Sequence, residues 1–147
     1  EWTELQGLVY GPCMVEADPY PHVREFFSWC RAQGITVYIV SHKTKYPIRG
    51  EKHDLHKFTR EWLEQKGFYN EPIALSPKRV FLEVTKEDKL NRINTLCCTH
   101  FIDDLPEALR AKGWNNTTTR ILFDPDNKHA ETQFKKTYSW KKMGELL

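Results

Sequence analysis

The sequence predicts an α/β fold in which helices cover both faces of a parallel β-sheet. Helical and extended patterns alternate along the chain, the connections between extended segments are too long for hairpins, and the clearest strand is apolar on both faces. The length of 147 residues fits one domain, because a domain usually takes roughly 100 to 200 residues. We therefore expect one core and one main site.

The first helix leads directly into the first clear strand. Pro21 suits a first helical position, apolar residues recur at helical spacing as far as Cys30, and Gly34 ends the pattern. Residues 35–40 are rich in β-branched and aromatic side chains, which is typical of a strand buried in a parallel sheet. This strand is predicted to end at Ser41.

The later elements continue the alternation. An apolar stripe predicts a helix over residues 53–66, and residues 79–84 predict a strand. Thr85 and Asp88 have the spacing of a capping box at the start of a third helix. Beyond it we expect a strand at 99–102, a short helix from Pro106, a strand at 120–123 and a terminal helix near 138–146.

Composition excludes several classes of protein. The formal net charge is only +2, so the chain lacks the basic excess of a general nucleic-acid binder. No apolar run approaches the ~18 residues of a membrane span. The four cysteines show no CxxC spacing, and adjacent Cys97 and Cys98 are poorly placed for a disulfide bridge. We expect a soluble, cytoplasmic protein that binds neither nucleic acid nor a membrane.

Polar residues gather at the predicted strand ends. Right-handed crossovers align the carboxyl ends of parallel strands at one edge, where ligands bind in open α/β sheets. Asp103 and Asp104 would repel one another there unless a cation such as Mg²⁺ lay near, although one could equally cap the helix at Pro106. Ser41 offers a hydroxyl, and Lys86 opens a helix, where a bound anion would favour it. Each residue alone also has an ordinary structural interpretation.

Taken together, these motifs resemble the haloacid dehalogenase superfamily of phosphohydrolases. Residues 39–44 match its second motif, Lys86 its third, and residues 101–107 its fourth, which also looks like that of 5′-nucleotidase-type members. The resemblance covers roughly residues 18 to 124. It implies a three-layer, Rossmann-like fold for residues 21–147, with residues 1–20 as a connector or the end of a truncated cap.

The resemblance also implies a chemistry. Ser41, His42 and Lys86 would bind a phosphoryl group, and Asp103 and Asp104 would hold Mg²⁺. The function expected is a Mg²⁺-dependent phosphomonoesterase or phosphotransferase acting on a small phosphorylated molecule. The family's nucleophile and its general acid/base lie in a DxD motif after the first strand, and residues 1–40 contain no such motif. We therefore expect this chain alone to be inactive.

Two explanations account for the missing motif. In the favoured one, Glu1 is an internal position of a longer protein whose missing N-terminal part carries the DxD strand and a helical cap. That missing segment or a second copy of the chain is a candidate partner. In the other, residues 7–11 are a decayed first strand, with Tyr10 near the place of an Asp. The only DxD, from Asp124 to Asp126, follows the predicted closing strand, has Pro in its middle and lacks the family's following Thr or Ser, so we set it aside.

Alternatives from other classes stay open. A catalytically inactive anion-binding or scaffold domain on the same fold would also explain the missing DxD. A nucleotide-binding regulatory module is less favoured, because neither GxGxxG nor a P-loop occurs. His53 and His56 could bind a metal, but their place at a helix start favours a capping or surface role. Lys43, next to the phosphate motif, could select an anionic substrate or simply be solvated.

Overall fold

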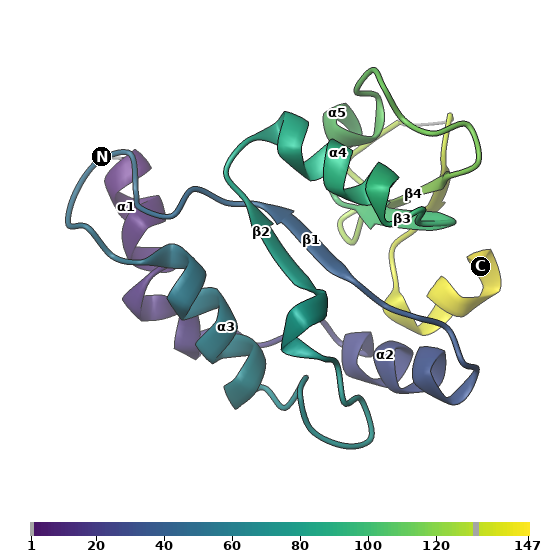
Figure 1. Cartoon of the computed structure of the whole chain (residues 1–147), viewed down its shortest axis with the longest axis horizontal. Coiled ribbons are helices and arrows are strands. Elements are labelled where there is room, and N and C mark those ends of the chain that lie inside the picture. Colours follow the sequence, from purple (N-terminus) through teal and green to yellow (C-terminus); the bar gives the residue numbers. More distant parts are fainter. Residues whose placement is uncertain (1, 131–132) are drawn as a thin grey trace.

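The computed structural model describes residues 2–130 and 133–147, and helices and strands alternate through them (Figure 1). The α-helices are Trp2–Val9 (α1), Val23–Ala32 (α2), Leu55–Gln65 (α3), Lys86–Thr95 (α4) and Pro106–Leu109 (α5). The 3-10 helices are Pro12–Glu16 (η1), Pro77–Arg79 (η2) and Trp140–Leu146 (η3). The strands are Ile39–His42 (β1), Val80–Glu83 (β2), His100–Asp103 (β3), Thr119–Phe123 (β4) and Lys135–Thr137 (β5). The protein is a mixed α/β structure, as predicted.

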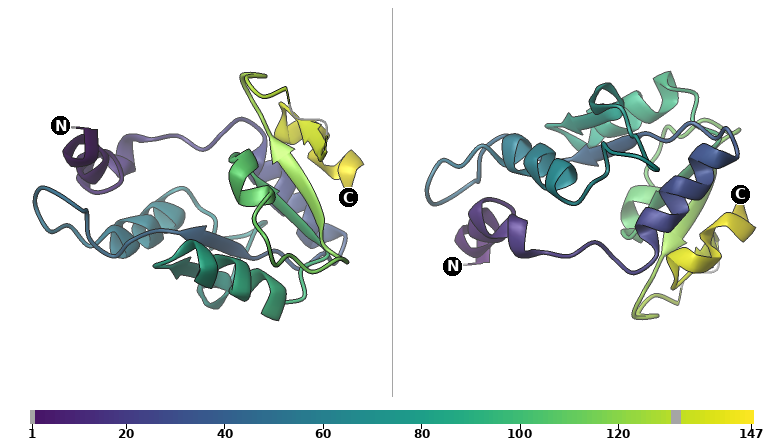
Figure 2. Two further views of the ribbon diagram at one scale, coloured as in Figure 1. Left: turned by 90° about the horizontal axis from the view of Figure 1, so that it is seen from above. Right: turned by 90° about the horizontal axis from the view of Figure 1, so that it is seen from below.

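The strands form two parallel sheets instead of the single continuous sheet expected from the sequence. β1 pairs with β2, with Ser41 opposite Leu82, and the second sheet has the order β3-β4-β5, with Ile102 opposite Ile121. Within the described residues, no ladder joins β1 to β3. No described strand bridges the two sheets (Figure 2). The described residues therefore do not form the predicted three-layer arrangement around one sheet.

Helices cover both faces of the β1-β2 sheet. One face carries Ile39, Val80 and Leu82, which pack with Leu63 of α3 and Phe27 of α2. The opposite face faces α4. There Glu83 of β2 accepts a hydrogen bond from Arg92 Nε at 2.8 Å, and the Arg92 guanidinium lies over the Phe81 ring. α2 and α3 therefore lie on one side of this sheet and α4 on the other.

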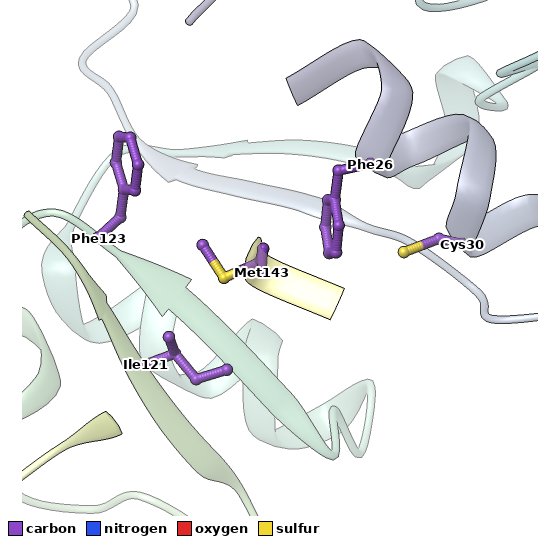
Figure 3. Close-up of a cluster of buried hydrophobic side chains, with 5 residues drawn as sticks. All are labelled: Phe26, Cys30, Ile121, Phe123 and Met143. Atoms are coloured by element: carbon purple, nitrogen blue, oxygen red, sulfur yellow. The ribbon is translucent and has the colours of Figure 1, made fainter. Parts of the chain in front are cut away.

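A cluster of buried hydrophobic side chains joins α2 to the second sheet. Phe26 and Cys30 of α2 meet Ile121 and Phe123 of β4 and Met143 of η3 (Figure 3). Ile121, like Met143, is completely buried. Removing a side chain of this size from water contributes about 1.5 to 3 kcal/mol. This cluster fixes α2 against β4 although the two sheets share no backbone hydrogen bonds.

Local signals account for several element boundaries. Gly34 has a φ of 70°, a left-handed conformation that glycine adopts without strain, and it follows α2 as predicted. Asp54 caps α3 by accepting a hydrogen bond from Lys57 N at 3.0 Å. The capping box at Thr85 is confirmed, because its hydroxyl oxygen accepts from Asp88 N at 3.0 Å.

Other expectations need correction. The alternative of a decayed strand at residues 7–11 is wrong, because this stretch is largely helical: α1 and η1 lie in the segment expected to be a connector or the end of a truncated cap. The strand at residues 35–40 begins later, at Ile39, and includes Ser41. β5 was not predicted, because its Lys-Lys-Thr sequence lacks an apolar pattern, and the terminal helix is of the 3-10 type. Among the described residues, no helix has the length and apolar character that crossing a membrane requires.

Candidate functional site

The strongest polar contact at a strand end joins Lys89 to Asp103. Asp103 is the last residue of β3, and its side chain is 6% exposed. Its Oδ2 accepts a hydrogen bond from Lys89 Nζ at 2.5 Å, and its Oδ1 accepts from the backbone N–H of Leu105 at 3.0 Å. A buried carboxylate is stable only when it is paired and hydrogen-bonded. Lys89 and Leu105 together meet that requirement.

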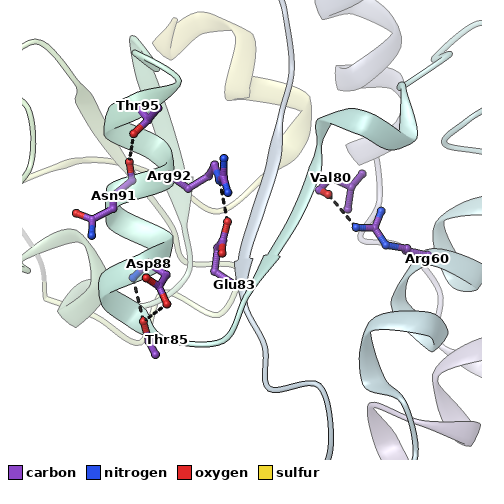
Figure 4. Close-up of polar contacts among 8 residues, drawn as sticks. All are labelled: Arg60, Val80, Glu83, Thr85, Asp88, Asn91, Arg92 and Thr95. Atoms are coloured by element: carbon purple, nitrogen blue, oxygen red, sulfur yellow. Dashed lines mark hydrogen bonds and ion pairs between the residues drawn. The ribbon is translucent and has the colours of Figure 1, made fainter.

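The position of Lys89 follows from how α4 is anchored. The capping box at Thr85 fixes the start of the helix, and Arg92 fixes its middle through Glu83 (Figure 4). Ile93, four residues after Lys89 and therefore on the same helix face, is completely buried. Helical side chains lean toward the N-terminus of their helix. Lys89 therefore reaches back toward the strand ends from the second turn of α4.

Asp104 adds a second carboxyl group beside Asp103. Surrounding protein atoms, which displace water from the Asp104 carboxyl group, and then the negative charge of Asp103 raise its pKa above the ordinary value. A divalent cation would relieve this repulsion, and Mg²⁺ is commonly bound by one or two carboxylates together with substrate phosphate. Within the described part of the chain, no group of three or more His, Cys, Asp and Glu side chains could hold a metal ion. The acidic pair would thus supply only part of a coordination shell.

Ser41 and His42 lie at the end of β1, as expected. The half-buried Ser41 hydroxyl makes no hydrogen bond to a described residue, whereas His42 Nε2 lies 3.1 Å from Val84 O. The backbone N–H of Lys43, which could have served an anion, donates to Glu83 O at 2.8 Å. That N–H is part of the sheet ladder. Ser41 belongs to the β1-β2 sheet and Asp103 to the β3-β4-β5 sheet, and no hydrogen bond between described residues joins their side chains.

The lysine at the acidic pair is Lys89, whereas the sequence pointed to Lys86. Lys86 is the first residue of α4, is exposed, and makes no hydrogen bond or ion pair to any described residue. The sequence did contain a signal for Lys89, since it precedes Ile93 by four residues and so continues the buried face of α4. A lysine at the solvent end of an apolar helix face is therefore a better candidate for contact with a strand-end carboxylate than a lysine at the helix start.

Lys43 occupies an unusual setting beside the same strand end. Its Nζ donates to Thr59 Oγ1 at 2.9 Å and lies 4.8 Å from the centre of the Tyr10 ring. Met14 Sδ is 3.9 Å away. None of these neighbours is a carboxylate, and burial lowers the pKa of Lys43 to about 8. Lys43 thus fastens η1 to α3, and its ammonium group is turned to neutral partners instead of solvent.

The other polar groups singled out in the sequence have structural partners. His56 Nε2 lies 2.6 Å from Lys43 O, and His53 lies 3.4 Å from a Glu51 carboxylate oxygen. Asp124 is buried and accepts hydrogen bonds from the backbone N–H groups of Lys128 and His129 at 2.9 and 3.0 Å. The Asp124 carboxylate therefore holds the loop after β4. All four cysteines are free thiols.

With this geometry established, the chain was compared with known proteins. No protein-family model, no curated protein and no solved structure matches it.

Proposed function

We propose that the protein is a Mg²⁺-dependent phosphohydrolase or phosphotransferase of the haloacid dehalogenase type. Its substrate would be a small phosphorylated molecule, and its nucleophilic Asp would come from outside this chain. The observation that carries the proposal is the contact of Lys89 with Asp103 beside Asp104 at the end of β3. A cation and two adjacent carboxyl groups at the carboxyl end of a parallel strand suit the binding of a metal phosphate.

The residues would divide the work of binding. Asp103 and Asp104 would hold Mg²⁺, which would neutralise charge on a transferring phosphoryl group. Lys89 would provide the cation that faces the phosphoryl oxygens, with Asp103 fixing its ammonium group. Ser41 would donate its hydroxyl to an oxygen of the same group, since that hydroxyl makes no other hydrogen bond in the described residues. Lys86 and His42, also expected from the sequence to bind phosphate, would lie only at the margin of this phosphoryl site.

A non-catalytic anion-binding domain is the second candidate. The observation that favours it concerns the one DxD among the described residues, Asp124 to Asp126. It lacks the following Thr or Ser of the family's nucleophile motif, and the Asp124 carboxylate is bonded to its own loop. Both candidates require the same anion site, so binding of phosphate comes before turnover as a test.

The binding test is a calorimetric titration of inorganic phosphate into the chain with Mg²⁺ present. A charge-assisted contact is worth about 1.5 to 3 kcal/mol, so Lys89→Ala should weaken phosphate binding by roughly tenfold or more. Lys86→Ala is the matched control, because it removes an exposed lysine three residues away on the same helix. We expect that control to change the affinity less than about twofold, as a distant surface charge does.

Ser41→Ala guards against a folding artefact in the Lys89 variant. It removes a hydroxyl that bonds no described residue, so the free energy of unfolding should stay within about 0.5 kcal/mol of wild type while phosphate binding weakens. Equal losses from Lys86→Ala and Lys89→Ala would mean diffuse attraction instead of a site. Absence of phosphate binding to a folded wild-type chain would contradict both candidates.

A further inference from the structure

A cavity lies between the two sheets. Its volume is about 600 Å³. Ile39 and Val40 of β1 form one side and Phe101 and Ile102 of β3 the other, while Phe26 and Phe27 of α2 close one face. The segments that precede the two strands, residues 35–38 and 96–99, line it as well, whereas their last residues, His42 and Asp103, do not. The amino-terminal parts of β1 and β3 therefore lie together along this cavity. We call this cavity the slot.

Backbone hydrogen-bonding groups of both strands point into the slot. The backbone N–H of Lys43, directly after β1, donates to Glu83 O of β2. Thr99 O, directly before β3, accepts from the N–H of Thr119 in β4. Successive residues of a strand in a parallel sheet direct their N–H and C=O groups to opposite neighbours. Counting along each strand from these two bonds, the N–H and C=O groups of Val40, His42, His100 and Ile102 point toward the slot. Within the described part of the chain, no strand pairs with β1 or β3 on that side.

We infer that the slot is the binding site of one further β-strand, which runs parallel to β1 and β3 and joins the two sheets. Val40 is buried and Ile102 half-buried. Backbone groups left unpaired away from water cost free energy, and nearly all such groups are paired in native proteins. Neighbouring strands lie roughly 4.8 Å apart, so one strand can bond both edges at once. The apolar walls require a strand that is apolar on both faces, as central strands of parallel sheets are. The completed order is β2-β1-slot strand-β3-β4-β5.

The chain topology indicates where this strand comes from. β1 is followed by α3 and then β2, and α3 covers the face that carries Ile39 and Val80. The unit formed by a slot strand, α2 and β1 would cross to the neighbouring strand in the same direction along the sheet as the unit β1-α3-β2. Its helix would lie on the same face, because Phe27 of α2 packs there too. The two crossovers would then have the same hand, as parallel sheets require. The slot strand therefore precedes α2, and the described residues 2–22 contain no strand. The occupant is a segment of the same polypeptide on the N-terminal side of Trp2.

This inference also concerns the proposed site. The slot strand would end between Ser41 and Asp103, so a carboxylate directly after it would enter the gap between the two halves of the proposed phosphoryl site. Only this last point rests on the proposed function. The pairing of the strand with β1 and β3 follows from the backbone alone.

The test is amide hydrogen exchange, followed by NMR, on two proteins. One is the chain described here, and the other is the same chain extended by the residues that its gene encodes before Glu1. In the chain alone, the amides of Val40, His42, His100 and Ile102 should exchange rapidly. In the extended protein their exchange should slow by about 100-fold or more, as expected for amides paired within a core sheet. Lys43 and Thr119, whose N–H groups already bond β2 and β3, should be protected in both proteins.

Each other result overturns the inference. If the four amides stay fast in the extended protein while Lys43 and Thr119 remain protected, the slot does not bind that segment. If Lys43 and Thr119 lose protection as well, the extension disrupts the sheets instead of joining them. Protection of the four amides in the chain alone, together with a dimer in sedimentation, would assign the slot to a second copy. A gene with no coding sequence before Glu1 would leave the proposed strand without a source. Protection of the four amides without phosphate binding would support the slot strand and contradict the proposed function.

Discussion

Lys89 Nζ lies 2.5 Å from Asp103 Oδ2, and this contact joins the second turn of α4 to the last residue of β3. The side chains are 17% and 6% exposed, so water contributes little to either charge. A pair this buried stabilises the fold mainly by avoiding an unpaired charge, since the attraction largely offsets the desolvation of both groups. It also brings a cation and a carboxylate to the edge of the sheet where parallel α/β proteins bind ligands.

Replacing Lys89 by Met should therefore destabilise the protein strongly. The variant keeps most of the apolar stem but leaves Asp103 buried without its cation, and breaking such a pair typically costs about 3 to 5 kcal/mol. Urea unfolding followed by circular dichroism measures the change. Lys86→Met on the same helix should stay within about 0.5 kcal/mol of wild type, because Lys86 is exposed and unbonded. Similar values for the two variants would show that the contact with Asp103 does not stabilise the fold.

Asp104→Asn should stabilise the protein at neutral pH. Displaced water and the charge of Asp103 raise the pKa of Asp104 in the native state, so the native state binds more protons than the unfolded chain between the two pKa values. The free energy of unfolding then falls as pH rises through that interval. The Asn variant does not lose stability in this way. Its free energy of unfolding in urea should therefore exceed that of wild type at about pH 7 and equal it near about pH 3.

The matched control for Asp104 is Glu107→Gln, which removes an exposed carboxylate of α5 three residues away. It should give no advantage that depends on pH. If Asp104→Asn differed from wild type by the same amount at both pH values, a change in packing would be the cause, and the repulsion between Asp103 and Asp104 would be refuted.

The buried ammonium group of Lys43 should make the free energy of unfolding depend on pH in the alkaline range. Burial lowers its pKa from 10.5 to about 8, so between these values the unfolded chain binds more protons than the native state. Its contribution to the free energy of unfolding therefore rises with pH across that interval. Lys43→Met should stabilise the protein at about pH 7, by the order of 1 kcal/mol after allowance for solvent screening, and this gain should disappear by about pH 10.

Lys45→Met is the comparison for this experiment, because Lys45 is 54% exposed and two residues away. A gain for Lys43→Met that persisted unchanged at high pH would mean that packing against Met14 and Tyr10, instead of the buried charge, sets the difference.

The elements predicted correctly are those whose signals are local. The apolar stripe of α3 and the capping box of α4 each lie within one turn or two of the chain, and both are present. β5 escaped prediction because a short, polar strand has no period to detect. α1 and η1 escaped because glycine and proline in that segment favoured a connector. The division into two sheets was beyond reach, since which strands become neighbours depends on contacts far apart in sequence.

The candidate site shows the same limit at the level of single residues. Asp103 and Ser41 were found because each closes an apolar run, and the structure has both at strand ends. The choice between Lys86 and Lys89 depends on how α4 is rotated against the sheet. Side-chain lean and the burial of Ile93 turn Lys89 to Asp103, and spacing from the strand end does not reveal that rotation.

The most direct test of the proposed function is hydrolysis of an aryl phosphate in the presence of Mg²⁺. The chain described here should release phosphate no faster than buffer, whereas the chain extended by its upstream coding sequence should turn over, and Asp103→Asn should abolish that turnover. The opposite pattern, in which the chain alone is active and Asp124→Asn removes its activity, would contradict both the missing nucleophile and the structural role of Asp124. An extended protein whose slot amides are protected but which hydrolyses nothing would contradict the phosphohydrolase itself.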